Sequence, residues 1–421
     1  MSSHHFQDNK MIRFKQFLNE AVGKNLHMKH LEELVLDGDV DGTRQAINYL
    51  RSMRDMLAGH AKTAVNVTVK WDGAPAIFAG IDPTDGKFFV AKKGIFNKNP
   101  KVYKTAAEVD DDTTGELAMK LKLALAELPA LGIKGVVQGD FLYSKEDLKI
   151  VDIDGEPHVT FHPNTIVYAI PKNSALGKTI LASKLGVVWH TTYRGTSFED
   201  MSASFGEEIA SGLKTVKNVW SVDAVYKDVS GTASFTAAET ALVTNELSKA
   251  GKIFQSLPRA VFTDFANNTD LLERSKVFIN SKIRIGEPVT NPSKFVSELR
   301  AALAAYYDKE IAAKKTEKSK TALAEKKDAV DAYFVKHGSK VVDLFVLYNH
   351  IVNAKLMIIR KLDKAKQVGT FLKMADGLKV TEQEGFVAID HASGNAVKFV
   401  DRLSFSNANF SSNIIKGWEK K

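Results

Sequence analysis

The sequence of 421 residues contains no cysteine. This absence excludes disulfide bonds, a thiolate nucleophile and any zinc site that uses cysteine ligands. No apolar run approaches the length that crosses a bilayer, and residues 1–8 are polar and lack the apolar stretch of a signal peptide. We therefore expect a cytoplasmic protein without a membrane partner, and the sequence gives no basis for inferring a protein partner.

Positive charge is in modest excess. The chain has 58 Lys and Arg residues against 50 Asp and Glu residues, which gives a net charge of +8 and a pI of about 9.1. Such a surplus favours a polyanionic partner such as nucleic acid, although many equally basic proteins have none. The length is sufficient for two or three domains with buried cores.

The first part of the chain is predicted to be helical. Apolar residues recur at helical spacing through residues 11–61, and we assign residues 1–62 to an N-terminal helical segment. The Asp- and Gly-rich residues 37–42 interrupt this pattern. Their ligand spacing does not fit a calcium loop, so we interpret them as a turn that caps the next helix.

The pattern then changes to short strands. Val65, Val67 and Val69 alternate with polar residues, which predicts a half-buried strand. Turn signals at residues 85–86 and 154–155 predict hairpins. Further strands are expected at residues 88–93, 135–143, 157–160 and 166–170, with a helix at 117–128. This mixture predicts an α+β fold with antiparallel sheets flanked by helices.

Helical patterns dominate residues 197–367, and paired strands are expected at 384–390 and 395–402. We accordingly divide the rest of the chain into a core (63–196), an inserted helical domain (197–370) and closing strands (371–421). Seven lysines cluster within the insertion: Lys309, Lys314, Lys315, Lys318, Lys320, Lys326 and Lys327. They fit a solvated helix face, or alternatively a clamp on a nucleic-acid backbone.

The segment Val69-Lys70-Trp71-Asp72-Gly73 is the sharpest candidate for a catalytic site. Strand alternation places Lys70 and Asp72 on the polar face, away from the valines. A lysine attacks only as the neutral amine, so we expect nearby cations and partial burial to lower the pKa of Lys70. The Lys-x-Asp-Gly pattern alone also fits a surface lysine that leads into a turn.

Four further segments follow in a fixed order: Gln138-Gly139-Asp140-Phe141, Thr165-Ile166-Val167-Tyr168-Ala169, Glu384-Gly385-Phe386-Val387 and Ala396-Val397-Lys398-Phe399-Val400. Together with the lysine segment they resemble the covalent nucleotidyltransferase superfamily, which comprises the ATP-dependent DNA and RNA ligases and the mRNA capping enzymes. The resemblance covers about residues 64–169 and 382–402. The compact helical N-terminus suggests a phage-encoded member, which would act in the host cytoplasm.

The resemblance implies a role for each motif residue. Lys70 would attack the α-phosphate of ATP, expel pyrophosphate and hold AMP as a phosphoramidate. Asp140 would contact the ribose, Tyr168 would border the adenine, and Glu384, together with Asp140, would hold Mg²⁺ or Mn²⁺. Lys398 would neutralise the α-phosphate.

The remaining nucleotide-binding positions implied by the resemblance are Thr68, Val69, Asp72, Gly73, Lys92 (or its neighbour Lys93) and Arg402. Two positions depart from the family pattern: the Gly-Glu motif is Gly139-Asp140, and the last motif has one lysine instead of two. We expect Arg402, on the same strand face as Lys398, to substitute for the missing cation.

The expected function is that of an ATP-dependent polynucleotide ligase that joins 3′-OH and 5′-phosphate ends of DNA or RNA. The long segment between the aromatic strand and the Glu-Gly strand is expected to be a large helical insertion. Only 19 residues follow Arg402, so we expect no C-terminal OB domain. Two alternatives remain open: a capping-type nucleotidyltransferase, and a catalytically inactive nucleotide- or nucleic-acid-binding protein. Residues 190–194 are polar and could face the substrate, but we interpret them as structural.

Overall fold

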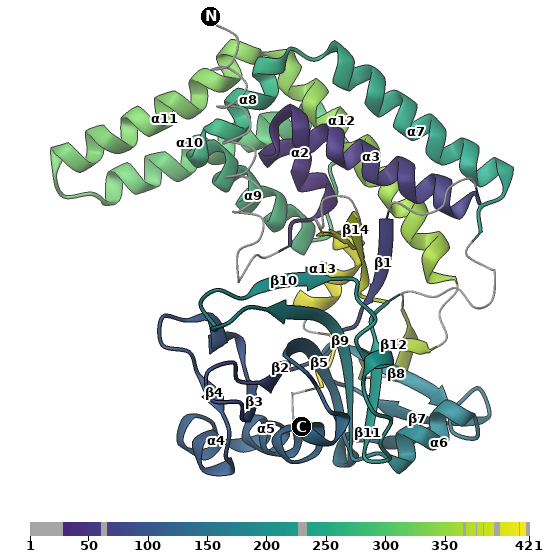
Figure 1. The fold of residues 1–421 in the computed structure, drawn as a ribbon. Helices are drawn as coiled ribbons and strands as arrows, with labels where there is room; N and C mark the ends of the chain where they lie inside the picture. Colours follow the sequence, from purple (N-terminus) through teal and green to yellow (C-terminus); the bar gives the residue numbers. More distant parts are fainter. Residues whose placement is uncertain are drawn as a thin grey trace, which may run out of the picture.

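The structure is a computed structural model that describes residues 28–59, 65–225, 234–364, 368–375, 377–381, 383–390, 396–411 and 413–417. The part of the first predicted helix before residue 28 lies outside these residues. The fold is α+β, as the sequence predicts. Helices gather in the upper half of Figure 1 and sheets in the lower half, with β1 and β14 between them.

One large helical unit combines helices from the predicted N-terminal segment (1–62) with helices from the predicted insertion (197–370). Its members are η1 (Leu31–Glu33), α2 (Leu34–Asp37), α3 (Asp39–Leu57), α7 (Ala237–Ser256), α8 (Arg259–Asn267), α9 (Thr269–Arg284), α10 (Pro292–Ala313), α11 (Glu317–His337) and α12 (Ser339–Asp363). Their buried apolar residues form a single cluster. The N-terminal helices and the expected insertion therefore share one hydrophobic core, whose burial stabilises both.

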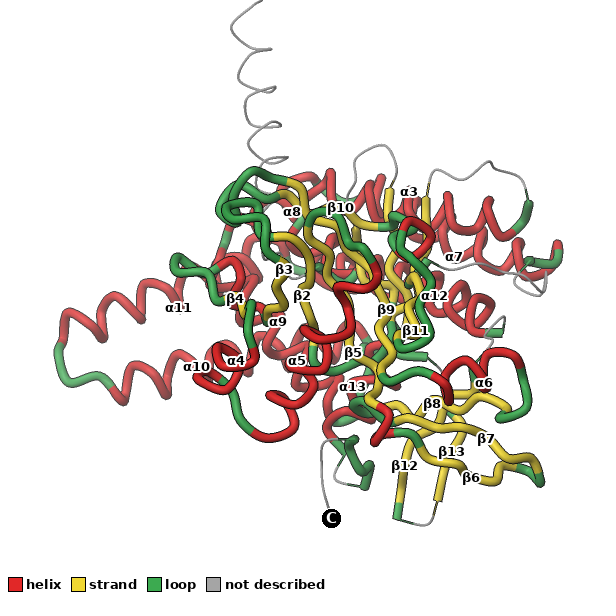
Figure 2. The backbone as a smooth tube through the Cα atoms, turned by 60° about the horizontal axis from the view of Figure 1, so that its bottom comes forward, coloured by secondary structure: helices red, strands yellow, loops and turns green. Residues whose placement is uncertain are grey.

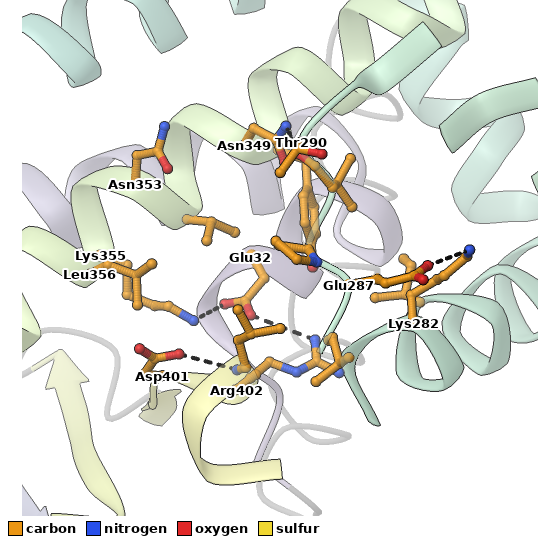
Figure 3. Close-up of a pocket in the computed structure, with 17 residues that line it drawn as sticks. Glu32, Lys282, Glu287, Thr290, Asn349, Asn353, Lys355, Leu356, Asp401 and Arg402 are labelled. Carbon is orange, nitrogen blue, oxygen red and sulfur yellow. Dashed lines mark hydrogen bonds and ion pairs between the residues drawn. The ribbon is translucent and has the colours of Figure 1, made fainter. Parts of the chain in front are cut away.

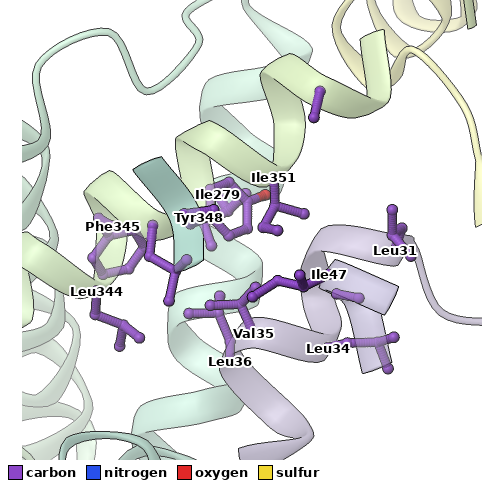
Figure 4. Packing of buried hydrophobic residues seen from close by; sticks show 14 of the residues in the cluster. Leu31, Leu34, Val35, Leu36, Ile47, Ile279, Leu344, Phe345, Tyr348 and Ile351 are labelled. Carbon is purple, nitrogen blue, oxygen red and sulfur yellow. The ribbon is translucent and has the colours of Figure 1, made fainter. Parts of the chain in front are cut away.

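Helix α12 lies at the centre of this unit. Its Leu344, Phe345 and Ile351 are fully buried and face the α2 and α3 residues Val35 and Ile47 (Figure 4). By length and composition alone, α12 is apolar enough to cross a membrane, so the expectation that no apolar segment approaches that length was wrong. Its packing against α3 and α7 accounts for that composition as the core of the helical unit.

A three-stranded antiparallel sheet lies against the helical core. It has the order β1-β14-β15, from β1 (Val65–Lys70), β14 (Gly385–Asp390) and β15 (Ala396–Phe399). Val67, Phe386 and Phe399 belong to the helical core cluster, so this face of the sheet is buried. Because side chains alternate along a strand, Thr68 and Lys70 lie on the opposite face. The strands predicted at 65–70 and 384–390 are confirmed, and the strand predicted at 395–402 is confirmed only over Ala396–Phe399.

The second sheet has seven strands in the order β10-β9-β5-β2-β3-β4, and β11 pairs with β9 in parallel. Its strands are β2 (Ala76–Ile81), β3 (Phe88–Ala91), β4 (Val102–Tyr103), β5 (Val136–Ser144), β9 (Leu185–Arg194), β10 (Ser202–Phe205) and β11 (Val219–Asp223). Helices α4 (Ala106–Asp112) and α5 (Gly115–Glu127) cover one face, where Leu121 and Trp189 are fully buried.

The third sheet has five strands in the order β13-β12-β8-β7-β6, all antiparallel. Its strands are β6 (Lys149–Ile153), β7 (Glu156–Phe161), β8 (Ile166–Pro171), β12 (Gly369–Met374) and β13 (Gly377–Val380). Helix α6 (Ala175–Ala182) follows β8, and α13 (Arg402–Phe410) follows β15. Strand β12 joins this sheet directly after the helical unit, so the chain returns to the sheets there.

Two expectations about chain segments were wrong. Residues 197–236 were expected to be helical, but in the described part of this range β10 and β11 extend the seven-stranded sheet, with one short 3-10 helix, η5 (Ala210–Gly212), and α7 begins at Ala237. Residue Arg402 was expected on a strand, but β15 ends at Phe399 and α13 begins at Arg402. The side chain of Asp401 caps α13 by accepting hydrogen bonds from the backbone N–H groups of Leu403 and Ser404.

Candidate active site

Lys70 is the last residue of β1 and lies beside Glu384, which immediately precedes β14. The pairing register sets Lys70 opposite Gly385, and the Lys70 Nζ forms an ion pair with Oε1 of Glu384. The side chains are 28% and 10% exposed, respectively. Two motif segments separated by most of the chain thus meet at one end of the three-stranded sheet (Figure 1).

Gly73 allows β5 to approach the lysine segment closely. A Cβ atom added at Gly73 would lie 2.4 Å from the Cβ of Asp140 and 3.1 Å from the carbonyl oxygen of Phe141. The contact is fixed by a backbone hydrogen bond of 2.9 Å from Ala74 to the same carbonyl. Only glycine fits here, and its presence brings Asp140 next to the turn that follows Lys70.

Burial raises the pKa of both site carboxyl groups to about 7. For Asp140 and Glu384 the loss of hydration is the largest cause, and the positive charge of Lys70 opposes it. The neighbouring Asp72 raises both pKa values further. Both carboxyl groups therefore change protonation near neutral pH, and both interact electrostatically with the ammonium group of Lys70.

The expectation of a lowered pKa at Lys70 is wrong for this state of the protein. Burial would lower the pKa of the lysine, but the charge of Glu384 and its hydrogen bond outweigh burial and raise it. Lys70 is therefore charged at neutral pH in this arrangement. The amine has to lose its proton before it can act as a nucleophile.

Asp72 anchors the turn after Lys70 to β8. Its carboxylate, 4% exposed, accepts hydrogen bonds from the backbone N–H groups of Thr165 (2.6 Å) and Ile166 (2.8 Å) and from the Asn164 amide (2.8 Å). The backbone N–H of Asp72 donates to the hydroxyl oxygen of Tyr168 at 2.7 Å. These contacts give the Asp of the Lys-x-Asp-Gly segment a positioning role.

Tyr168 is part of the core rather than an open surface. It is 3% exposed, and its ring packs against Trp71 and Phe161 with centroid distances of 4.9 Å and 5.3 Å. In this structure it supports the turn that carries Asp72. The ring of Trp71, the residue after Lys70, is only partly buried, and it is an aromatic candidate for the site that sequence reasoning missed.

Lys398 lies on the same sheet face as Lys70. The register runs from Thr68 to Val387 and on to Lys398, so these three side chains share one face. Burial lowers the pKa of Lys398, and repulsion from Lys70 lowers it further. The structure therefore brings Thr68 and Lys398 to the candidate site, whereas Val69 packs its side chain against the helical core on the other face.

Lys92 lies apart from this cluster. Its Nζ pairs with Oδ2 of Asp112 at 3.1 Å and lies 5.7 Å from the centroid of the Tyr103 ring. The next residue, Lys93, is exposed, and its charge lowers the pKa of Asp140. Of the two lysines considered from the sequence, Lys93 is thus the one that acts on the site.

Arg402 does not stand in for the missing second lysine of the last motif. Its Nη1 lies 3.5 Å from Glu32 and 3.2 Å from Glu33, and its Nη2 donates to the side-chain oxygen of Asn280. Lys355 holds Glu32 from the other side (Figure 3). The expected strand continuation failed because the chain turns at Asp401 and buries Arg402 at the start of α13.

This arginine lines a cavity of about 390 Å³ between α9, α12 and the start of α13 (Figure 3). Ile279, Leu356 and Leu403 supply apolar walls, and the Glu32–Lys355 pair closes one side. The positive and negative charges of the wall partner one another, so the cavity has no evident preference for one ligand charge.

His190 is a site residue that the sequence interpretation assigned to structure. It lies on β9 with its Nε2 3.9 Å from Oδ2 of Asp140, and its Nδ1 lies 2.7 Å from the hydroxyl of Thr191. Burial, with repulsion from Lys70, lowers its pKa to about 4, so the ring is neutral at pH 7. A histidine directly after the apolar run Val187–Trp189 was the available signal.

The carboxylates Glu384 and Asp140 are the residues that could hold a metal. No three His, Asp or Glu side chains converge on a metal site within the parts of the chain that the structure describes. Mg²⁺ commonly takes only one or two protein carboxylates and obtains its other ligands from water and substrate phosphates. Two carboxylates beside the nucleophile candidate fit that ligand set.

The chain belongs to a family of unknown function, DUF6267, whose family profile matches residues 25–414. No curated protein and no solved structure matches the chain.

Proposed function

We propose that this protein is a lysine-adenylating nucleotidyltransferase that acts as an ATP-dependent polynucleotide ligase. The observation that carries the proposal is the meeting of Lys70, Glu384 and Lys398 at one end of one sheet, with Asp140 beside the turn that follows Lys70. Their order in the sequence is the order that the superfamily uses. These segments were chosen by residue pattern and order, and their convergence at one end of a sheet supports the proposal.

The first step would form a bond between the Lys70 Nζ and the α-phosphorus of ATP and break the bond to pyrophosphate. Lys70 first has to lose a proton, and Glu384 is the group already in contact with its ammonium. A bound Mg²⁺ would neutralise charge on the phosphates. Lys398 would add a second positive charge on the same face, and such charge neutralisation is the main requirement of phosphoryl transfer.

Later steps would transfer AMP from Lys70 to a 5′-phosphate, after which a 3′-OH attacks that phosphate and releases AMP. Asp72 and Gly73 would keep the lysine in position, since one is tied to β8 and the other contacts Asp140. Asp140 and His190 would line the nucleotide side of the site. Nucleic acid with nicked or free ends is accordingly the proposed substrate.

The second candidate is a nucleotide- or nucleic-acid-binding protein without catalysis. Two observations favour it: Arg402 is bound to Glu32 and Glu33, and so does not supply the second cation of the last motif, and the pKa of Lys70 is raised. Both candidates predict nucleotide binding, and only the first predicts a covalent product.

The test is to incubate the protein with α-labelled ATP and Mg²⁺ and to measure label that remains on the chain after denaturation. The ligase proposal expects label on the parent protein, none on Lys70→Ala, and full labelling of Lys149→Ala, an exposed lysine at the start of a strand. Discharge of the label by a nicked duplex would then support ligation. If ATP, GTP and NAD all leave the parent unlabelled, the proposed chemistry is wrong and the binding-protein alternative stands.

A further inference from the structure

Helices α10 and α11 form an arm that projects from the helical unit in both Figure 1 and Figure 2. The last buried residue of α10 is Tyr307 and the first of α11 is Val330, and none of the residues 308–329 between them is buried. A helix rises about 1.5 Å per residue, so the α11 part of this stretch spans about 20 Å. This stretch, residues 308–329, which we call the outer arm, thus adds no buried side chain to the core.

The outer arm carries unpartnered positive charge. Residues 309–320, which we call the tip, contain five lysines and two glutamates. Lys314 and Lys320 pair with these glutamates. The side chains of Lys309, Lys315 and Lys318 are exposed and make no ion pair or hydrogen bond with the described residues. Lys315 lies in the loop that joins the helices, and Lys309 and Lys318 lie within about two helical turns of it.

The arm belongs to the most basic part of the chain. Residues 237–364 hold 22 Lys and Arg against 15 Asp and Glu, and the remaining residues hold 36 against 35. Nearly all of the net charge of +8 therefore lies in this helical region. A positive surface of this kind attracts a polyanion from a distance and gains affinity from released counterions.

The composition of the tip also argues against a protein partner. Protein interfaces depend on buried aromatic and apolar anchors, and the exposed large hydrophobic residues on the described chain all lie outside residues 308–329. Contacts to a phosphate backbone need positive charge and no such anchor.

We propose that the arm tip binds the phosphate backbone of a duplex nucleic acid through Lys309, Lys315 and Lys318. This inference rests on the proposed ligase function, because it assigns the arm to the substrate of that reaction. These contacts are independent of base sequence. They are made to a part of the duplex that is distant from the reacting ends.

The experiment compares two triple variants of the full chain. Lys309→Gln, Lys315→Gln and Lys318→Gln are combined in the tip variant, because glutamine retains helix propensity and removes three charges. The control variant combines Lys252→Gln, Arg360→Gln and Lys364→Gln, which removes three exposed charges elsewhere in the helical unit. Circular dichroism checks that both variants keep the parent helix content.

Binding of a nicked duplex with a 5′-phosphate is measured by fluorescence anisotropy at several salt concentrations. For the tip variant we expect about 10- to 100-fold weaker binding near physiological salt, and a slope of log K against log salt that is smaller by about 2 to 3. The control variant is expected to bind like the parent. Parent-like binding by the tip variant, or equal weakening of both variants, would overturn the proposal.

The lysyl-AMP assay separates this proposal from the proposed function. Tip and parent proteins are expected to accept equal label from ATP, because the arm is not part of the Lys70 site. Failure of the parent to take label would count against the ligase reaction, whereas the duplex affinities would still decide whether the tip binds a phosphate backbone.

Discussion

The ion pair between Glu32 and Lys355 joins η1 to α12 inside the helical unit. The Lys355 Nζ lies 2.7 Å from Oε2 of Glu32, and the two side chains are 1% and 2% exposed for Lys355 and Glu32, respectively. Substituting Lys355→Met would leave the carboxylate without its main partner. Removal of one member of a buried pair typically costs about 3–5 kcal/mol, because the other charge stays in a medium of low polarity.

The pKa of Glu32 gives a second estimate of how much this ion pair contributes to the free energy of unfolding. Burial alone would raise this pKa, but the attraction of Lys355, with smaller contributions from neighbouring cations, lowers it from 4.5 to about 2. That difference corresponds to about 3 kcal/mol of stability at neutral pH. Because the folded-state pKa is the lower one, this stability is present above about pH 4.5 and is lost as the pH falls towards 2.

The assay is urea unfolding followed by far-ultraviolet circular dichroism, which mainly reports the helices that share this core. For Lys355→Met we expect a loss of about 3–5 kcal/mol in unfolding free energy at pH 7, and a smaller difference from the parent as the pH is lowered below 4.5. The control is Lys340→Met on the same helix, whose exposed pair with Asp343 should be worth less than about 1 kcal/mol. Equal losses for the two variants would refute the reasoning.

Three further predictions concern the candidate active site. Gly73→Ala would place a methyl group 2.4 Å from the Asp140 Cβ, so we expect lysyl-AMP formation to fall about 100-fold with an unchanged circular dichroism spectrum; unchanged labelling would contradict the close approach. Because burial raises the pKa of Asp140 from 3.8 to about 7, this carboxyl group destabilises the fold by an amount that grows between these two pH values and is complete above pH 7. Asp140→Asn should therefore raise the melting temperature at pH 8 and change it little near pH 4, as calorimetry can check. Since the pKa of Lys70 is raised, the rate of lysyl-AMP formation should increase with pH between about 6 and 9, and a flat profile in rapid-quench measurements would show that the proton is lost before the measured step.

Local pattern was sufficient to predict the strands that carry Lys70, Asp140 and Lys398, but not β9, which carries His190. The alternation of Val65, Val67 and Val69 predicted β1 and its polar face, and the glycine-containing turns predicted two of the hairpins. It was not sufficient for β10 and β11, which have four and five residues and pair with successive stretches of the edge of β9 that β5 leaves open. Such short strands are defined by their neighbours more than by their own residues.

Long-range arrangement explains the other differences. The shared core of α3 and α12 could not be read from either segment, because an amphipathic helix does not specify which partner covers its apolar face. The contact between Lys70 and Glu384 was anticipated only through the order of the motifs. Arg402 was misplaced because strand alternation was extended past Phe399, where the chain turns.

The candidate site draws its groups from two differently supported parts of the fold. Lys70 and Lys398 lie on the sheet whose opposite face is packed into the helical core, whereas Asp140 and His190 are on adjacent strands of the seven-stranded sheet. The turn at Gly73 is one covalent link between the two parts, and its contact with Asp140 leaves no room for a side chain. The distance from Lys70 to Asp140 and His190 therefore depends on how the helical unit sits against the sheets. Under the proposed function, a side chain added at Gly73 should therefore slow adenylation, because it would displace Asp140 relative to Lys70.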